Sequence, residues 1–267
     1  MPVAHLNGID IYFEHSGQGP RLLFFNGSGA TLERTGPLLE PFRARFEVLA
    51  HDQRGLGRSQ IPPGPYSMKD YAADAVALLG FVGWPSCCVI GVSFGGMVAQ
   101  EFAVTAIGQV ERLVLACTSP GGTGGSSYPL HELGPSNERA SHEGMLPLLD
   151  TRFTAEYLAG HPADRALASM ISARAAVAGS AEQARGEREQ LLARSVHDVW
   201  ERLPKINCPT LVAAGRYDGI APLANSEAMV SRIPSSQLRV YEGGHMFFAQ
   251  DPRAIPEILD FLSGPDA

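Results

Sequence analysis

The stretch Gly91-Val92-Ser93-Phe94-Gly95 combines a serine with small neighbours at a spacing typical of nucleophilic catalysis. Glycine two positions before and two positions after the serine lets a strand and a helix approach closely on either side of a strained turn. Such a turn exposes the hydroxyl at the positive end of the following helix. The pattern predicts that Ser93 is a nucleophile, with a purely structural Gly-Ser turn as the alternative.

A serine hydroxyl is a poor nucleophile without a base, and the base needs an acid to orient it. Asp218 follows the apolar run 209–214, and His245 follows the shorter run 238–241. Like Ser93, both come after predicted strands, at the edge where open parallel sheets place their sites. We therefore predict that Ser93, Asp218 and His245 are the catalytic residues. The alternatives are a turn role for Asp218, because Asp-Gly is common in turns, and a loop or core role for His245.

Acyl transfer also needs two backbone N–H groups that hold the oxyanion formed at the substrate carbonyl. One is expected from Phe94, the residue after the nucleophile. The second is expected from the early loop Asn26-Gly27-Ser28-Gly29, where we favour the amide of Ser28 over that of Gly27. A plain glycine-rich turn is the alternative interpretation of this loop.

Short apolar runs alternate with segments of helical spacing on both sides of these residues. The predicted strands are 8–15, 21–25, 46–50, 87–90, 112–117, 209–214 and 238–241. The predicted helices are 32–42, 67–80, 97–105, 223–233 and 255–262. Strands that alternate with helices predict an α/β fold, in which a parallel sheet is covered by helices on both faces.

The alternation stops after Thr118, where the glycine-rich segment 120–125 predicts a flexible exit from the sheet. Residues 128–203 contain helical patterns and no clear strand. The predicted organisation is a core made of residues 1–118 and 206–267, with a helical insertion at 119–205.

Composition restricts the classes of protein to which the chain can belong. A chain of 267 residues that is 45% apolar suits one large domain, or a core with a sizeable insertion. The net charge of −7, without a basic cluster, argues against nucleic acid or an anionic membrane as a partner. No run of 18 apolar residues and no secretory signal pattern is present. Four cysteines, Cys87, Cys88, Cys117 and Cys208, show no metal-ligand spacing, and no disulfide framework is expected in a chain of this length. Cys87 and Cys88 lie in an apolar run and are interpreted as buried free thiols. These features favour a reducing, cytoplasmic setting.

At this point the chain resembles the α/β-hydrolase fold superfamily over nearly its whole length. The resemblance rests on the segments 26–29, 52–59 (Asp-Gln-Arg-Gly-Leu-Gly-Arg-Ser), 91–95, 215–218 and 243–245. It implies a mostly parallel eight-stranded sheet flanked by helices, with the insertion as a cap over the site, and the chain order Ser, Asp, His. It implies no metal and no organic cofactor. Within the superfamily the chain looks most like the 3-oxoadipate enol-lactonase and small carboxylesterase group.

Several residues differ from those typical of neighbouring groups in the superfamily. Asn26 stands where many members have histidine, but the backbone N–H donors of the loop do not depend on that side chain. A serine at position 93 argues against haloalkane dehalogenases and epoxide hydrolases, which carry aspartate there. Val92 departs from the asparagine of meta-cleavage hydrolases, and Met246 departs from the lysine of plant hydroxynitrile lyases.

The expected function is that of a cytoplasmic serine hydrolase, monomeric or homodimeric. It would cleave a carboxylic ester or lactone of a small organic substrate through an acyl-enzyme. A C–C bond hydrolase, a lyase or a cofactor-free perhydrolase on the same triad is the first alternative. A small-molecule receptor without catalysis is the second.

Overall fold

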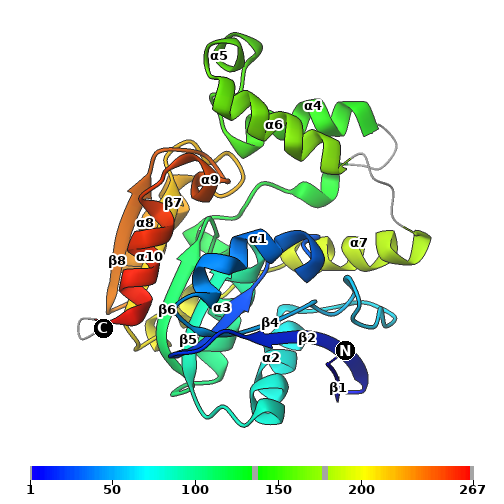
Figure 1. Cartoon of the computed structure of the whole chain (residues 1–267), viewed down its shortest axis with the longest axis vertical. Coiled ribbons are helices and arrows are strands. Elements are labelled where there is room, and N and C mark those ends of the chain that lie inside the picture. Colours follow the sequence, from blue (N-terminus) through cyan, green and yellow to red (C-terminus); the bar gives the residue numbers. More distant parts are fainter. Residues whose placement is uncertain (1, 134–137, 176–179, 265–267) are drawn as a thin grey trace.

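The computed structural model describes residues 2–133, 138–175 and 180–264 of the chain. A single eight-stranded sheet runs through it in the order β1-β2-β4-β3-β5-β6-β7-β8, with helices on both faces (Figure 1). The strands are β1 (Val3–Leu6), β2 (Ile9–Ser16), β3 (Arg21–Phe25), β4 (Glu47–His51), β5 (Cys87–Val92), β6 (Val110–Ala116), β7 (Thr210–Gly215) and β8 (Ser236–Tyr241). Strands β3 to β8 pair in parallel, and the β1–β2 and β2–β4 pairs are antiparallel. This confirms the predicted fold class.

The central strands are mostly apolar because each face of the sheet is buried under helices. In β3, Leu23 and Phe25 belong to one hydrophobic cluster and Leu22 and Phe24 to the other, and all four are fully buried. Successive side chains of a strand point to opposite faces, so an unbroken apolar run satisfies both layers. The sheet is therefore the rigid frame on which the loops are mounted.

Two helical layers complete the core. The helices outside the insertion are α1 (Leu32–Arg43), α2 (Met68–Val82), α3 (Phe94–Thr105), α8 (Leu223–Arg232), α9 (Phe247–Gln250) and α10 (Ala254–Ser263). Tyr71 of α2 and Phe102 of α3 pack into the first cluster, whereas Phe42 of α1 and Ile258 of α10 pack into the second. The predicted helices are all present, with boundaries shifted by a few residues.

Outside the insertion, two short elements of the described core, β1 and α9, were not predicted. Strand β1 pairs with β2 around a hairpin turn formed by Asn7 and Gly8, both with positive φ. Asn-Gly is the preferred pair for such a turn, so the signal was present in the sequence. Helix α9 has four residues, too few to show a helical repeat.

The segment between β6 and β7 is helical. It contains α4 (Glu138–Leu149), α5 (Ala155–Gly160), α6 (Pro162–Ala175), α7 (Ala181–Ser195) and three 3-10 turns at 122–124, 130–132 and 200–205. Figure 1 shows α4, α5 and α6 grouped at one end of the molecule, apart from α7. The predicted insertion, 119–205, includes 134–137 and 176–179, which lie outside the described residues, and its boundaries stay a prediction.

Within the described ranges, each helix is too short or too polar to cross a lipid bilayer. The four cysteines are buried and free, which confirms the prediction made for Cys87 and Cys88.

Candidate active site

Ser93 occupies a sharp turn between β5 and α3. Its backbone lies at φ 55° and ψ −116°, a region that non-glycine residues rarely adopt. A methyl group added to Gly91 would overlap the carbonyl oxygen of Gly95, and one added to Gly95 would overlap that of Phe25. The two glycines therefore allow the close approach that holds Ser93 in this strained turn, as the spacing predicted.

The structure brings Ser93, His245 and Asp218 together, although 152 positions separate the first two. The Oγ atom of Ser93 lies 2.8 Å from Nε2 of His245, and Nδ1 of His245 lies 2.8 Å from Oδ2 of Asp218. A carboxylate only accepts hydrogen bonds, so Nδ1 carries the proton and Nε2 accepts from the Ser93 hydroxyl. All three residues are buried. The arrangement can deprotonate a serine hydroxyl during attack on a carbonyl.

The loop after β7 fixes the orientation of Asp218. Its Oδ1 atom accepts hydrogen bonds from the backbone N–H groups of Ile220 and Ala221, each at 2.8 Å. These bonds leave Oδ2 for His245. The backbone of its own loop thus orients the carboxylate toward the imidazole.

The loop after β8 is held by the helical segment. The backbone N–H of His245 donates to the carbonyl oxygen of Leu149, at the end of α4, at 2.6 Å. The neighbouring Gly244 donates its N–H to Oε1 of Gln250 at 2.9 Å. The position of the imidazole therefore depends on both α4 and α9.

The loop predicted to supply an oxyanion donor lies against Ser93. A Cβ atom built on Gly27 would lie 3.5 Å from Cβ of Ser93. Neither the Ser28 amide nor the Phe94 amide donates a hydrogen bond to another described residue. Phe94 is the first residue of α3, where backbone N–H groups have no partner within the helix. Both amides are thus available to a ligand, and their role as the oxyanion hole stays a prediction.

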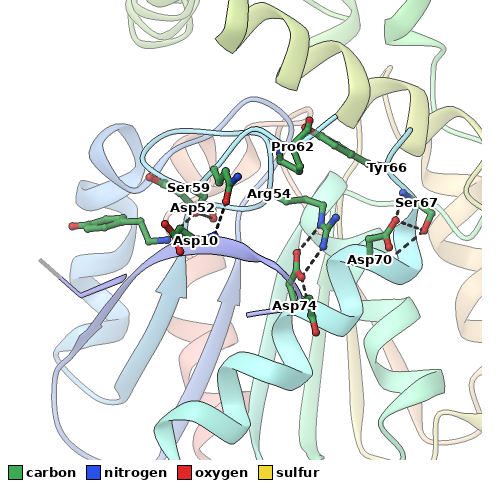
Figure 2. A network of polar contacts seen from close by, with 12 residues as sticks. Asp10, Asp52, Arg54, Ser59, Pro62, Tyr66, Ser67, Asp70 and Asp74 are labelled. Carbon is green, nitrogen blue, oxygen red and sulfur yellow. Dashed lines mark hydrogen bonds and ion pairs between the residues drawn. The ribbon is translucent and has the colours of Figure 1, made fainter. Parts of the chain in front are cut away.

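The segment 52–59, on which the family resemblance partly rested, braces this region (Figure 2). Arg54 donates to both carboxylate oxygens of Asp74 on α2, at 2.7 and 2.8 Å. Asp52 accepts from the backbone N–H of Leu32, the first residue of α1, at 2.7 Å and from that of Arg58 at 2.9 Å. The motif therefore fixes the loop after β4 and the start of α1, which follows the oxyanion loop in the chain.

Two glutamines hold the oxyanion loop itself. Gln53 donates through Nε2 to the carbonyl oxygen of Asn26 at 2.8 Å. Gln190 on α7 accepts through Oε1 from the backbone N–H of Gly29, also at 2.8 Å. The bond from Gln53 is to the carbonyl oxygen of Asn26, so it does not depend on the side chain at position 26.

Sequence reasoning singled out none of the three glutamines that support the site. Gln53 lies inside a recognised motif, which was a usable signal. Gln190 holds a loop 161 positions away in the sequence, and Gln250 accepts from a backbone N–H. No sequence pattern marks such contacts. Among the described residues, no group of three or more histidine, cysteine or acidic side chains is arranged to hold a metal ion.

Comparison with known proteins identifies the family of the chain. A family model described as alpha/beta hydrolase fold matches residues 20–252. The poly(3-hydroxyalkanoate) depolymerase of Ectopseudomonas oleovorans is 33% identical over 248 residues, covering 90% of this chain and 83% of the relative. The 3-oxoadipate enol-lactonase 2 of Acinetobacter baylyi is 26% identical, with 97% of each chain covered.

A solved structure shows the same fold. The enol-lactonase from Burkholderia xenovorans LB400 has a TM-score of 0.81 with this chain at 22% identity, covering 98% of this chain and 100% of the other. The family model spans most of the chain, and the relatives named above are hydrolases. The chain therefore belongs to the alpha/beta hydrolase fold family, as its motifs predicted, and is a hydrolase.

Proposed function

We propose that the protein hydrolyses a carboxylic ester or lactone of a small organic molecule through an acyl-enzyme on Ser93. The observation that carries the proposal is the continuous contact from Ser93 Oγ to His245 Nε2 and from His245 Nδ1 to Asp218, each at 2.8 Å. A serine in this arrangement has a base within reach of its proton.

The reaction proceeds in two steps. His245 takes the proton of Ser93 as the hydroxyl attacks the carbonyl carbon, and Asp218 stabilises the imidazolium that forms. The amides of Ser28 and Phe94 hold the oxyanion, and His245 returns the proton to the departing alcohol. Water, activated by the same histidine, then releases the acid and restores Ser93.

The relatives support an ester bond as the target. A poly(3-hydroxyalkanoate) is a polyester and an enol-lactone is a cyclic ester, and these are the compounds in the names of the two relatives. Both share the bond type proposed here while differing in the molecule that contains it. We propose the bond class on this basis. We also propose that the segment 119–205 is a cap that shapes the substrate pocket.

The test is hydrolysis of p-nitrophenyl esters of rising acyl length and of simple lactones by the wild type and by Ser93→Ala. We expect turnover by the wild type and a loss of at least about a thousandfold in kcat for Ser93→Ala, because the acyl acceptor is gone. Circular dichroism of both proteins is the control for folding. Absence of turnover on every ester and lactone, from a folded wild type, would contradict the proposal.

A further inference from the structure

Arg194, in the last turn of α7, is a buried cation without an anionic partner among the described residues. The residue is 5% exposed, and its contact within the described part of the chain is a hydrogen bond from Nη1 to the carbonyl oxygen of Tyr128 at 2.7 Å. Its Nε atom is buried and has no acceptor there. Arg54, another well-buried arginine near the site, is by contrast neutralised by both oxygens of Asp74.

An unpaired buried guanidinium is unfavourable because the protein must remove it from water without returning a counter-charge. Burial lowers the pKa of Arg194 to about 10, and the negative charge of Asp218 offsets only part of that effect. Asp218 is itself engaged by His245 and by two backbone amides. The described residues therefore provide no carboxylate that pairs directly with Arg194.

Arg194 lines a cavity of about 240 Å³. Hydroxyl and imidazole groups share its wall, from Ser126, Ser127, Ser195, His131 and His197. His197 is buried, and neither of its ring nitrogens has a hydrogen-bond partner in the described chain. The described wall thus combines a guanidinium without a paired carboxylate and the unpartnered imidazole of His197, and both can donate hydrogen bonds to a carboxylate.

The cavity is linked to the triad through its wall residues Met97 and Arg194. Met97, which lines it, lies four positions after Ser93 on α3, one helical turn along the helix. The carbonyl oxygen of Tyr128 accepts from Arg194, while the N–H of Tyr128 donates to the carbonyl oxygen of Ile220 at 2.8 Å. Ile220 in turn donates its own N–H to Asp218. Arg194 is therefore connected to the catalytic aspartate through two residues.

We infer that this cavity is a subsite for a carboxylate carried by the substrate, and that the guanidinium of Arg194 binds it. The preferred substrate would then be an ester or lactone with a second, negatively charged carboxylate group. The inference rests on the proposed function and names its substrate class. A remote charge bound in this way positions the scissile carbonyl without taking part in bond cleavage.

The test compares pairs of substrates that differ only in the remote charge. The p-nitrophenyl hemiesters of succinic, glutaric and adipic acid are each matched with the neutral p-nitrophenyl ester of equal acyl length. We expect the wild type to prefer at least one hemiester in kcat/KM. For Arg194→Gln, the ratio of kcat/KM for that hemiester to kcat/KM for its neutral partner should fall about 10- to 100-fold, the range expected for a hydrogen bond to a charged group. Arg188→Gln, which changes an exposed arginine on the same helix, should leave the ratio unchanged.

Two results would overturn the inference. The inference is overturned by the wild type alone if it hydrolyses no hemiester better than the neutral partner. An Arg194→Gln protein that loses activity equally on both members of each pair would show that Arg194 only supports the loop at Tyr128.

A binding measurement separates this inference from the proposed function. Calorimetry with glutarate, using the wild type and Arg194→Gln, requires no turnover. Binding by the wild type that is lost in Arg194→Gln supports the subsite even if no ester is hydrolysed, whereas hydrolysis of neutral esters without glutarate binding supports the function and contradicts the subsite. If Arg194→Gln does not fold, Arg194→Lys retains the charge but loses the planar fork, and weaker glutarate binding than in the wild type is expected.

Discussion

Asp218 uses its two carboxylate oxygens for different contacts. One oxygen is fixed by the amides of Ile220 and Ala221, and the other faces Nδ1 of His245. The division matters because an oxygen that only accepts hydrogen bonds determines which nitrogen of the imidazole carries the proton. The tautomer that leaves Nε2 free to accept from Ser93 is therefore set by a residue that does not touch the nucleophile.

Replacing Asp218 with asparagine tests this reasoning at the scale of one atom. An amide nitrogen facing His245 would favour the opposite tautomer, so kcat should fall by about a thousandfold or more while the fold is retained. Ester hydrolysis with excess substrate measures kcat, and thermal unfolding is the control. A variant with kcat within about tenfold of the wild type would contradict the role given to Asp218.

At this scale, the sequence allowed prediction of residues whose role depends on local geometry. Ser93 was predictable because its turn requires small neighbours at fixed offsets. Asp218 and His245 were predictable because each follows an apolar strand. Arg194 carried no comparable signal, because its importance lies in a partner that is missing, and this is visible only when the surrounding residues are in place.

Helix α9, with four residues, connects the histidine loop to the helical segment. Gln250, its last residue, accepts from the N–H of Gly244 at 2.9 Å. The same side chain donates to Asp150, just past α4, at 2.8 Å and to Asp164 on α6 at 3.1 Å. One amide group thus joins the loop that carries His245 to two parts of the insertion.

Removal of this side chain in Gln250→Ala should loosen the histidine loop. We expect kcat to fall about 3- to 10-fold, since a typical net hydrogen bond is worth about 1 kcal/mol. Gln237→Ala, at an exposed position on β8, is the matched control and should leave kcat unchanged. Equal kcat values for Gln250→Ala and the wild type would contradict the positioning role.

Elements could be predicted to the extent that their periodicity was long enough to detect. Helix α2 has a complete local signal, with Ser67 and Asp70 forming reciprocal capping hydrogen bonds and Gly83 ending the helix in the left-handed region. Helix α9 is too short to carry such a signal. The contact of α7 with the oxyanion loop, through Gln190 and Gly29, joins residues 161 positions apart. That contact depends on how the helical segment packs, which local patterns do not contain.

At the scale of the whole molecule, two buried histidines, His51 and His197, favour the neutral form. His51, at the end of β4, packs its ring edge-on against Phe25 at a centroid distance of 5.9 Å. Burial lowers the pKa of His51 to about 4, and it also lowers the pKa of His197 to about 4. Both side chains resist protonation only while the chain is folded.

This difference predicts how global stability depends on pH. In the unfolded chain these histidines titrate near their ordinary pKa of about 6.5. Between about pH 6.5 and pH 4 the unfolded state therefore binds protons that the folded state does not. Stability is fully present above pH 6.5 and is lost as the pH falls toward 4, with a slope of up to about 1.4 kcal/mol per pH unit for each histidine.

Urea denaturation at pH 7, 6 and 5 measures the slope. In His51→Gln the free energy of unfolding should depend less steeply on pH than in the wild type, because one of the two groups no longer titrates. Parallel curves for the two proteins would show that His51 is not buried in neutral form.

The central claim, that Ser93 carries the acyl group, is tested most directly by trapping the acyl-enzyme. Wild-type protein is mixed with excess p-nitrophenyl acetate, quenched in acid within the first turnovers, digested and analysed by mass spectrometry. The account predicts a burst of p-nitrophenol and an acetyl group on the peptide that contains Ser93, with neither in Ser93→Ala. Hydrolysis at the wild-type rate by Ser93→Ala, or an acetyl group on a different residue during productive turnover, would contradict it.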